Sequence, residues 1–197
     1  MPPSLVLAST SPIRRKLLTD AGLSFASRSP LVDEAAIKRA HPDLAPDLLA
    51  LRLAEAKALA ILEPNPYTIV IAADQILALE ATTFDKPDSI TAARSQLTTL
   101  RGKTHSLLSA VTCAQDNKII WRHVAQAHLT MRNFTGVFLD EYIAACQNGI
   151  VTSVGAYKLE ERGIQLFDRI DGDYFTILGL PLLPLLQFLR TQGAAQS

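Results

Sequence analysis

The chain has 197 residues, of which 48% are hydrophobic and 19% charged, and its 19 acidic side chains balance its 19 basic ones. A chain of this length can bury a core without disulfide or metal staples, so we expect residues 1–197 to form a single domain. Zero net charge argues against a nucleic-acid-binding protein, which needs a basic surface, and against a polybasic membrane anchor.

The two cysteines and the apolar segments indicate a cytoplasmic protein. Cys113 and Cys146 lie in no CxxC motif, so we expect reduced thiols, as in the cytosol. The opening MPPSLVLAST lacks the features of a signal peptide. The leucine-rich segment 177–190 is too short, and too interrupted by proline, to span a bilayer.

The first half of the chain reads as strands alternating with helices. Residues 4–8 predict a buried strand, and a helix follows, with Ser11 as N-cap, Pro12 at its start and Gly22 at its end. Residues 23–30 predict an edge strand. Residues 44–64 predict a helix whose apolar face is made by Leu49, Leu53, Ala56 and Ala60. Residues 68–80 predict a buried strand that is interrupted at Asp74 and Gln75.

The second half adds an antiparallel pair of strands. A helix over 88–102, capped by Asp88, precedes two strands over 104–131 that are joined by a turn at 115–118. A helix over 139–149, a strand within 163–174 and a C-terminal helix from Pro181 complete the pattern. We therefore expect a mixed α/β fold, a twisted mixed sheet flanked by helices.

Three cations follow the first predicted strand. Arg14, Arg15 and Lys16 fall in the first turn of a helix, where positive charge opposes the helix dipole. A bound phosphate at this hydroxyl-rich turn would compensate them, with Arg14 as a bidentate ligand. A neighbouring Asp or Glu, or simple solvation, would also account for them.

Asp74 stands inside an apolar, β-branched run. A carboxylate there is costly unless it is paired or binds a cation. It could serve as a general base or a magnesium ligand, or it could be a structural residue that caps a loop.

Five further polar residues carry weaker signals. Glu34 follows Asp33 in what reads as a solvated loop, and Lys57 lies on an otherwise apolar helix, where snorkelling to the surface is the simplest explanation. Lys86 reads as a turn residue, Glu160 as solvated surface, and His105 as a hydrogen-bonded structural residue.

Taken together, eight short motifs resemble the Maf family of nucleoside triphosphate pyrophosphatases. In chain order they are LASTSPIRR, VDE, LAEAKA, AADQ, KP, LRGKTH, GAYKLE and GDYFTILGLP, and they span about Leu5 to Leu189. The resemblance implies two lobes around a cleft, a shape related to inosine triphosphate pyrophosphatases, a divalent cation (Mg²⁺ or Mn²⁺) and a possible homodimer.

The resemblance also assigns roles residue by residue. It implies that Ser9, Arg14, Lys57 and Lys86 bind the triphosphate of a nucleoside triphosphate substrate. It implies that Asp74 is the proton acceptor, and that Glu34 or Asp74 holds the metal. The implied products are a nucleoside monophosphate and pyrophosphate.

Three positions follow the family's division by base, and here they are Ile13, Gln75 and Glu160. The branch that acts on 7-methyl-GTP typically has Trp, Gln and Glu, and the branch that acts on dTTP and UTP has Arg, Thr and Gln. Gln75 and Glu160 match the first branch, and Ile13 matches neither. A carboxylate can also accept two hydrogen bonds from the guanine edge. We therefore expect a purine-type substrate, 7-methyl-GTP or another modified nucleotide, with a dTTP/UTP pyrophosphatase as the alternative.

A second hypothesis comes from a different class. Members of the family have been linked to inhibition of septum formation, so the chain could be a non-catalytic, nucleotide-binding regulator. The presence of Glu34, Lys57, Asp74 and Lys86 together disfavours an inactive enzyme.

Overall fold

The computed structural model describes residues 2–61, 63 and 65–196. The chain divides into two compact units. Unit 1 comprises residues up to Gln75, Ser109–Ala125 and the segment from Tyr174 onward, and unit 2 comprises Ile76–Leu108 and Gln126–Asp173.

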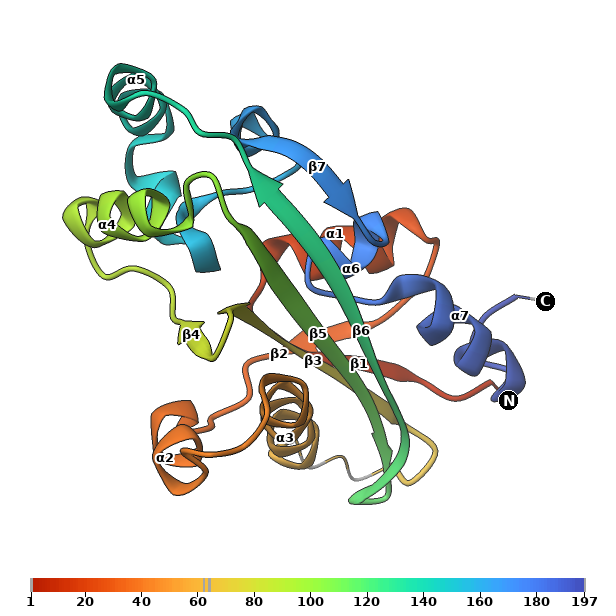
Figure 1. Ribbon diagram of the computed structural model, residues 1–197. Coiled ribbons are helices and arrows are strands. Elements are labelled where there is room, and N and C mark those ends of the chain that lie inside the picture. Colours follow the sequence, from red (N-terminus) through yellow and green to blue (C-terminus); the bar gives the residue numbers. More distant parts are fainter. Residues whose placement is uncertain (1, 62, 64, 197) are drawn as a thin grey trace. The chain divides into compact units, whose positions relative to one another are not determined.

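The strands belong to a mixed sheet with the order β2-β1-β3-β5-β6-β7, and β4 pairs with β3 off this path (Figure 1). β1 (Leu5–Ala8) pairs in parallel with β2 (Ala26–Arg28) and with β3 (Ile69–Leu79). β3 pairs antiparallel with β4 (Thr82–Phe84). The predicted mixed sheet flanked by helices is confirmed, and the 23–30 segment supplies an edge strand as expected.

In unit 1, the alternation of side chains along the strands decides which helix covers which face. Even-numbered residues of β1 and β3 pack with α3 (Pro46–Leu59) and with Ile61, two residues beyond its end, in one apolar cluster. The cluster is formed by Val6, Ala8, Val70, Ala72, Ala114, Ala58 and Ile61. Asp74 continues this even-numbered row along β3. The row therefore carries Asp74 to the face that α3 covers.

The opposite face of unit 1 meets three other helices: α1 (Pro12–Asp20), α6 (Tyr174–Ile177) and α7 (Leu182–Thr191) (Figure 1). Gln75, one residue beyond Asp74, donates hydrogen bonds to backbone carbonyls of α6. Leu17 and Leu18 of α1 and Leu182, Leu185 and Leu189 of α7 are buried. The adjacent residues Asp74 and Gln75 of β3 thus point to opposite faces of the sheet.

Unit 2 consists of the remaining parts of β3, β5 (Thr104–Gln115) and β6 (Lys118–Met131) together with its own elements. These are β4, α4 (Ile90–Leu100), α5 (Gly136–Cys146), three short 3-10 helices between residues 147 and 166, and β7 (Phe167–Asp171). β7 pairs antiparallel with β6.

The β5–β6 hairpin was predicted, and its turn has a clear local cause. Asp116 and Asn117 both adopt positive φ, 49° and 57°. These residue types tolerate the left-handed region that tight hairpin turns need.

Several predicted details are wrong. β3 is continuous through Asp74 and Gln75, because both side chains find polar partners without breaking the ladder. Glu34, expected in a solvated loop, instead begins α2 (Glu34–Ala40), since Asp33 caps this helix by accepting the N–H of Ala36.

The helix limits and one helix face also differ. Ser89, not Asp88, caps α4. α5 begins three residues before its expected start, because Thr135 is its N-cap. On α3, Ala60 is exposed, and the buried stripe runs instead through Ala50, Leu53, Ala54, Lys57 and Ala58.

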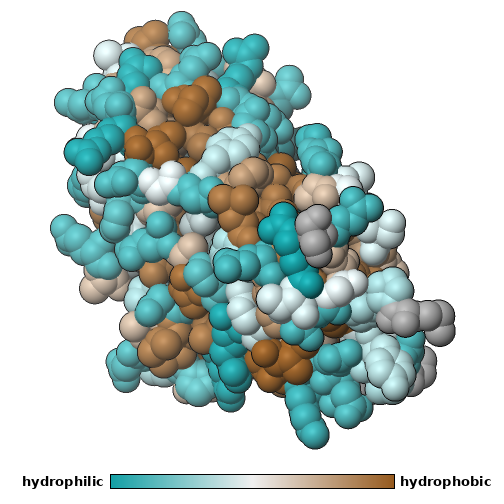
Figure 2. Space-filling view, turned by 90° about the vertical axis from the view of Figure 1, so that its right-hand side faces the viewer, coloured by the Kyte–Doolittle hydropathy of each residue, from teal (hydrophilic) through white to brown (hydrophobic). Residues whose placement is uncertain are grey.

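On the face shown in Figure 2, hydrophobic residues form separate patches among hydrophilic ones. The most exposed large apolar side chains, Leu31, Tyr67, Val137 and Leu183, are far apart in the sequence, and single exposed apolar residues are ordinary. The homodimer stays a prediction. Among the described residues, no helix has both the length and the apolar character needed to cross a membrane.

Candidate active site

The turn after β1 is organised by its own hydroxyl groups. Ser9 is buried, and its Oγ accepts the N–H of Ser11 at 3.1 Å. Ser27 donates its hydroxyl to the carbonyl of Ser9 at 3.1 Å. Ser11 is the predicted N-cap of α1, with its Oγ facing the N–H of Arg14 at 3.5 Å. The turn is therefore fixed before any ligand arrives.

Arg14 points inward from the first turn of α1 and joins three segments of unit 1. Its Nε donates to the carbonyl of Gly179 and its Nη1 to the carbonyl of Ala73, both at 2.8 Å. Burial lowers the pKa of the guanidinium, while Asp74 and Glu34 raise it. A guanidinium stays charged under such shifts. Asp74 and Glu34 thus lie close enough to compensate this cation, which is one of the explanations that the sequence left open.

The other two cations of this turn behave differently. Arg15 is exposed. Lys16 pairs with Asp20 at 2.8 Å on the surface of the same helix. Of the three, only Arg14 enters the candidate site.

Lys57 lies between two carboxylates. Its Nζ is 2.5 Å from Oδ1 of Asp74 and 2.8 Å from Oε1 of Glu34. The side chains of Lys57 and Asp74 are only 11% and 9% exposed, whereas that of Glu34 is 46% exposed. The ammonium therefore does not snorkel to the surface, because α3 directs it onto the sheet residue that needs a counter-charge.

The electrostatics of the cluster favour a reactive carboxylate at Asp74. Burial raises the pKa of Asp74, and the positive charges of Lys57 and Arg14 oppose that rise. Two cations and the two anions Asp74 and Glu34 make the cluster neutral overall. Perturbed carboxylates of this kind are common at functional sites.

The cluster also fits a divalent cation. Glu34 and Asp74 already converge on one positive group, the ammonium of Lys57. Among the described residues, no group of three or more His, Cys, Asp or Glu side chains could hold a metal ion. Two carboxylates suit Mg²⁺, which usually binds one or two protein carboxylates together with phosphate oxygens.

Gln75 is held from three sides within unit 1. Its Nε2 lies 2.9 Å from Oγ of Ser109, 3.1 Å from the carbonyl of Thr176 and 3.0 Å from that of Ile177. Ser109 also donates to the carbonyl of Thr176 at 2.8 Å. Sequence reasoning missed Ser109, whose only signal is a hydroxyl within an apolar strand. The amide nitrogen of Gln75 is committed to the protein, and its Oε1 is the atom left for other contacts.

The remaining predicted residues lie as follows. Ile13 is half-buried in α1 of unit 1. Lys86 and Glu160 belong to unit 2, and both are exposed. The cluster in unit 1 therefore brings together Arg14, Glu34, Lys57 and Asp74, and the roles predicted for Lys86 and Glu160 stay predictions.

His105 is structural, as expected. It is buried in unit 2, and its Nε2 forms a 2.8 Å hydrogen bond with the hydroxyl of Tyr157. Burial lowers the pKa of His105 to about 4. It is therefore a neutral core histidine at ordinary pH.

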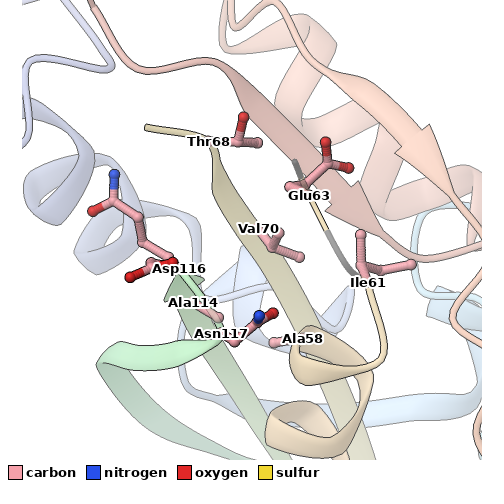
Figure 3. Close-up of a pocket in the computed structure, with 9 residues that line it drawn as sticks. Ala58, Ile61, Glu63, Thr68, Val70, Ala114, Asp116 and Asn117 are labelled. Atoms are coloured by element: carbon pink, nitrogen blue, oxygen red, sulfur yellow. The ribbon is translucent and has the colours of Figure 1, made fainter. Parts of the chain in front are cut away.

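A small pocket lies elsewhere in unit 1 (Figure 3). Figure 3 shows Val70 on β3 with Thr68 just before that strand, Ala58 near the end of α3 with Ile61 beyond it, and Asp116 and Asn117 at the hairpin turn. Asp74 is four residues beyond Val70, about 13 Å along the strand. Glu63, which lines the pocket, has a buried Oε1 that pairs with Nη1 of Arg28 at 2.7 Å. This pocket lacks the clustered charges of the candidate site.

Comparisons with known proteins show which proteins the chain resembles. A family profile described as Maf-like protein matches residues 4–192. The chain is 50% identical over 190 residues to the 7-methyl-GTP pyrophosphatase of Brucella abortus, which covers 95% of this chain and 96% of that one. It is 44% identical over 198 residues to the nucleoside triphosphate pyrophosphatase of Rhodospirillum rubrum, with 99% and 98% covered. A solved HAM1 protein from Coxiella burnetii shows a TM-score of 0.38 at 12% identity over 66% of this chain and 74% of that one, and we draw nothing from a likeness of that size.

Proposed function

The chain belongs to the Maf-like protein family, and on that premise we propose that it is a nucleoside triphosphate pyrophosphatase. The observation that carries the proposal is the cluster in which Lys57 lies between Asp74 and Glu34 with Arg14 nearby. The names of the relatives, pyrophosphatases that act on 7-methyl-GTP or on nucleoside triphosphates, support the same reaction.

In this proposal Asp74 is the general base. It orients a water molecule and takes its proton as the water oxygen attacks the α-phosphorus. The bond between the α-phosphorus and the oxygen that bridges it to the β-phosphate breaks. Pyrophosphate is the leaving group, and a nucleoside monophosphate is the other product. Burial raises the pKa of Asp74, which brings a carboxylate closer to the range in which a base works efficiently at neutral pH.

The cations and the turn would hold the triphosphate. Lys57 supplies an ammonium beside the base, and the turn at Ser9 supplies backbone amides next to a helix start. Arg14 already donates to two carbonyls through Nε and Nη1, so a phosphate contact would use Nη2 or the second N–H of Nη1. Catalysis in this scheme comes from positioning and charge stabilisation, as in phosphoryl transfer generally. Lys86 remains a predicted further phosphate ligand.

Glu34 and Asp74 would hold the divalent cation. When bound, Mg²⁺ or Mn²⁺ would neutralise charge on the phosphate oxygens as a Lewis acid. The half-exposed Glu34 leaves one side of this pair open to solvent and ligand.

For the base, we propose a purine of the 7-methyl-GTP type. Gln75 and Glu160 are the residues that support it, together with the names of two relatives. The Glu160 carboxylate would accept hydrogen bonds from guanine N1–H and the 2-amino group. Ile13 cannot stack on a cationic purine as an aromatic side chain would, so a broader substrate range is the alternative.

Pyrophosphate release tests both proposals. The purified protein is incubated with Mg²⁺ and 7-methyl-GTP, GTP, dTTP or UTP, and pyrophosphate and monophosphate are measured. We expect the fastest release from 7-methyl-GTP. A preference for dTTP or UTP over every purine would contradict the purine assignment, and nucleotide binding without release from any substrate would favour a non-catalytic regulator.

Asp74→Asn tests the base. The variant should lose about 10²- to 10⁴-fold in kcat, the range typical of a general base, while nucleotide binding stays measurable. Lys16→Met, which removes an exposed cation from the same unit, is the matched control and should leave turnover unchanged. Undiminished turnover in Asp74→Asn would remove Asp74 from this role.

A further inference from the structure

Lys57 occupies the position between the two carboxylates that are proposed to bind metal. Its Nζ lies 2.5 Å from Asp74 Oδ1 and 2.8 Å from Glu34 Oε1. Ala54 and Ala58, the small residues on either side of it on α3, are buried against the sheet, so the ammonium is directed onto the β3 carboxylate rather than to solvent. A cation of the chain itself therefore already lies between the two carboxylates and contacts both.

A divalent ion cannot share these oxygens with the ammonium at such distances. Mg²⁺ needs its ligand oxygens at about 2.0–2.1 Å in a near-octahedral arrangement. An ammonium hydrogen-bonded to the same oxygens would place two positive groups in contact. Binding of the ion through Glu34 Oε1 and Asp74 Oδ1 thus requires Lys57 to leave at least one of these two oxygens.

We propose that Lys57 is a resident counter-ion that closes the metal site until a divalent cation displaces it. The displaced ammonium becomes available to a phosphate oxygen of the substrate, so that metal and substrate binding are coupled through one side chain. This inference rests on the proposed function only for the assignment of Glu34 and Asp74 as metal ligands.

The exchange has a physical reason. Two carboxylates facing each other, one of them buried, repel when no cation lies between them. Breaking a partly buried ion pair by removing one partner leaves an uncompensated charge. Lys57 prevents that state in the metal-free protein, and the penalty for displacing it weakens metal binding until phosphate groups attract the freed ammonium.

Mn²⁺ binding to the nucleotide-free protein tests the proposal without any activity measurement. Wild type and Lys57→Met, which keeps the length and removes the charge, are titrated with Mn²⁺, and free ion is followed by electron paramagnetic resonance. We expect at least about tenfold tighter binding in Lys57→Met, a change equivalent to about 1.4 kcal/mol. Equal or weaker binding in the variant, or no Mn²⁺ binding by either protein, would overturn the proposal.

Two controls separate displacement from a general change of charge. Lys16→Met removes one exposed cation of unit 1 and should leave the Mn²⁺ affinity at the wild-type value. The double variant Lys57→Met/Glu34→Gln should lose the gain, because it removes one of the two ligands. A gain of equal size in Lys16→Met, or a gain that survives Glu34→Gln, would contradict the exchange.

A second measurement uses the wild type alone and does not depend on a folded variant. Acetylation of individual lysines by acetic anhydride is followed by peptide mass spectrometry with and without Mn²⁺. Lys57 should react several-fold faster with Mn²⁺, whereas Lys16 should not change. An unchanged rate at Lys57 would overturn the exchange even if pyrophosphate release is observed. Conversely, displacement without pyrophosphate release would overturn the proposed function alone.

Discussion

Arg14 joins three segments of unit 1, and its loss should destabilise the fold strongly. Arg14→Met removes two hydrogen bonds of 2.8 Å, one to the Ala73 carbonyl and one to the Gly179 carbonyl. Hydrogen bonds that involve a charged group contribute about 1.5–3 kcal/mol each. Removing both should lower the free energy of unfolding by about 3–6 kcal/mol. Arg14→Lys should lower it less, because a lysine keeps the charge but lacks the planar fork that reaches two carbonyls.

Urea unfolding, followed by circular dichroism, measures this change directly. Arg15→Met is the matched control, since the neighbouring Arg15 is exposed on the same helix, and surface changes are usually within about 0.5 kcal/mol. A loss of less than 1 kcal/mol in Arg14→Met, or an equal loss in Arg15→Met, would refute the view that Arg14 joins these segments.

Three further outcomes test other contacts. Gln75→Glu should lower the free energy of unfolding by about 2–4 kcal/mol, because it replaces an amide donor with an anion beside two backbone carbonyls; urea unfolding checks it, and wild-type stability would contradict it. Burial lowers the pKa of folded His105 to about 4, against about 6.5 in the unfolded chain. The contribution of the neutral imidazole to stability is therefore complete above pH 6.5 and falls as the pH drops towards 4. Wild type should therefore lose about 2 kcal/mol more than His105→Asn between pH 7 and pH 5, and equal losses would disprove this. Gly163→Ala should lower the free energy of unfolding by about 2–3 kcal/mol, since the added Cβ would clash with the Lys158 carbonyl. Gly149→Ala, whose Cβ would have open space around it, should not lower it. Equal melting temperatures of the two variants would contradict this prediction.

Local patterns in the sequence were sufficient for most of the secondary structure. The Ser11 cap followed by Pro12 predicted the start of α1, and the two strands around residues 115–118 predicted the hairpin. Interactions between neighbouring residues decide such features. Before α4, where Asp88 and Ser89 are both residue types that cap helices, Asp88 was predicted as the N-cap and Ser89 is the residue that caps the helix.

The chemistry at the site depended on contacts between residues far apart in the chain. From the sequence, Lys57 could be a snorkelling residue, Glu34 a solvated one and Asp74 a break in a strand. The packing of α3 on the even-numbered face of β1 and β3 brings Lys57 to Asp74, and α2 places Glu34 on the same ammonium. Residue types alone could not show this, because a buried charge is stable only with a partner, and the fold selects that partner.

The sequence by itself determined the family and the mixed α/β class, and it supplied the candidate site residues as predictions. Only the tertiary structure decided what those residues do to one another. It directed Arg14 to two carbonyls and committed the amide nitrogen of Gln75 to the 176–177 segment. It also set Lys57 between two carboxylates. The physical reason is the alternation along β3, which sends Asp74 and Gln75 to opposite faces, each covered by elements distant in sequence.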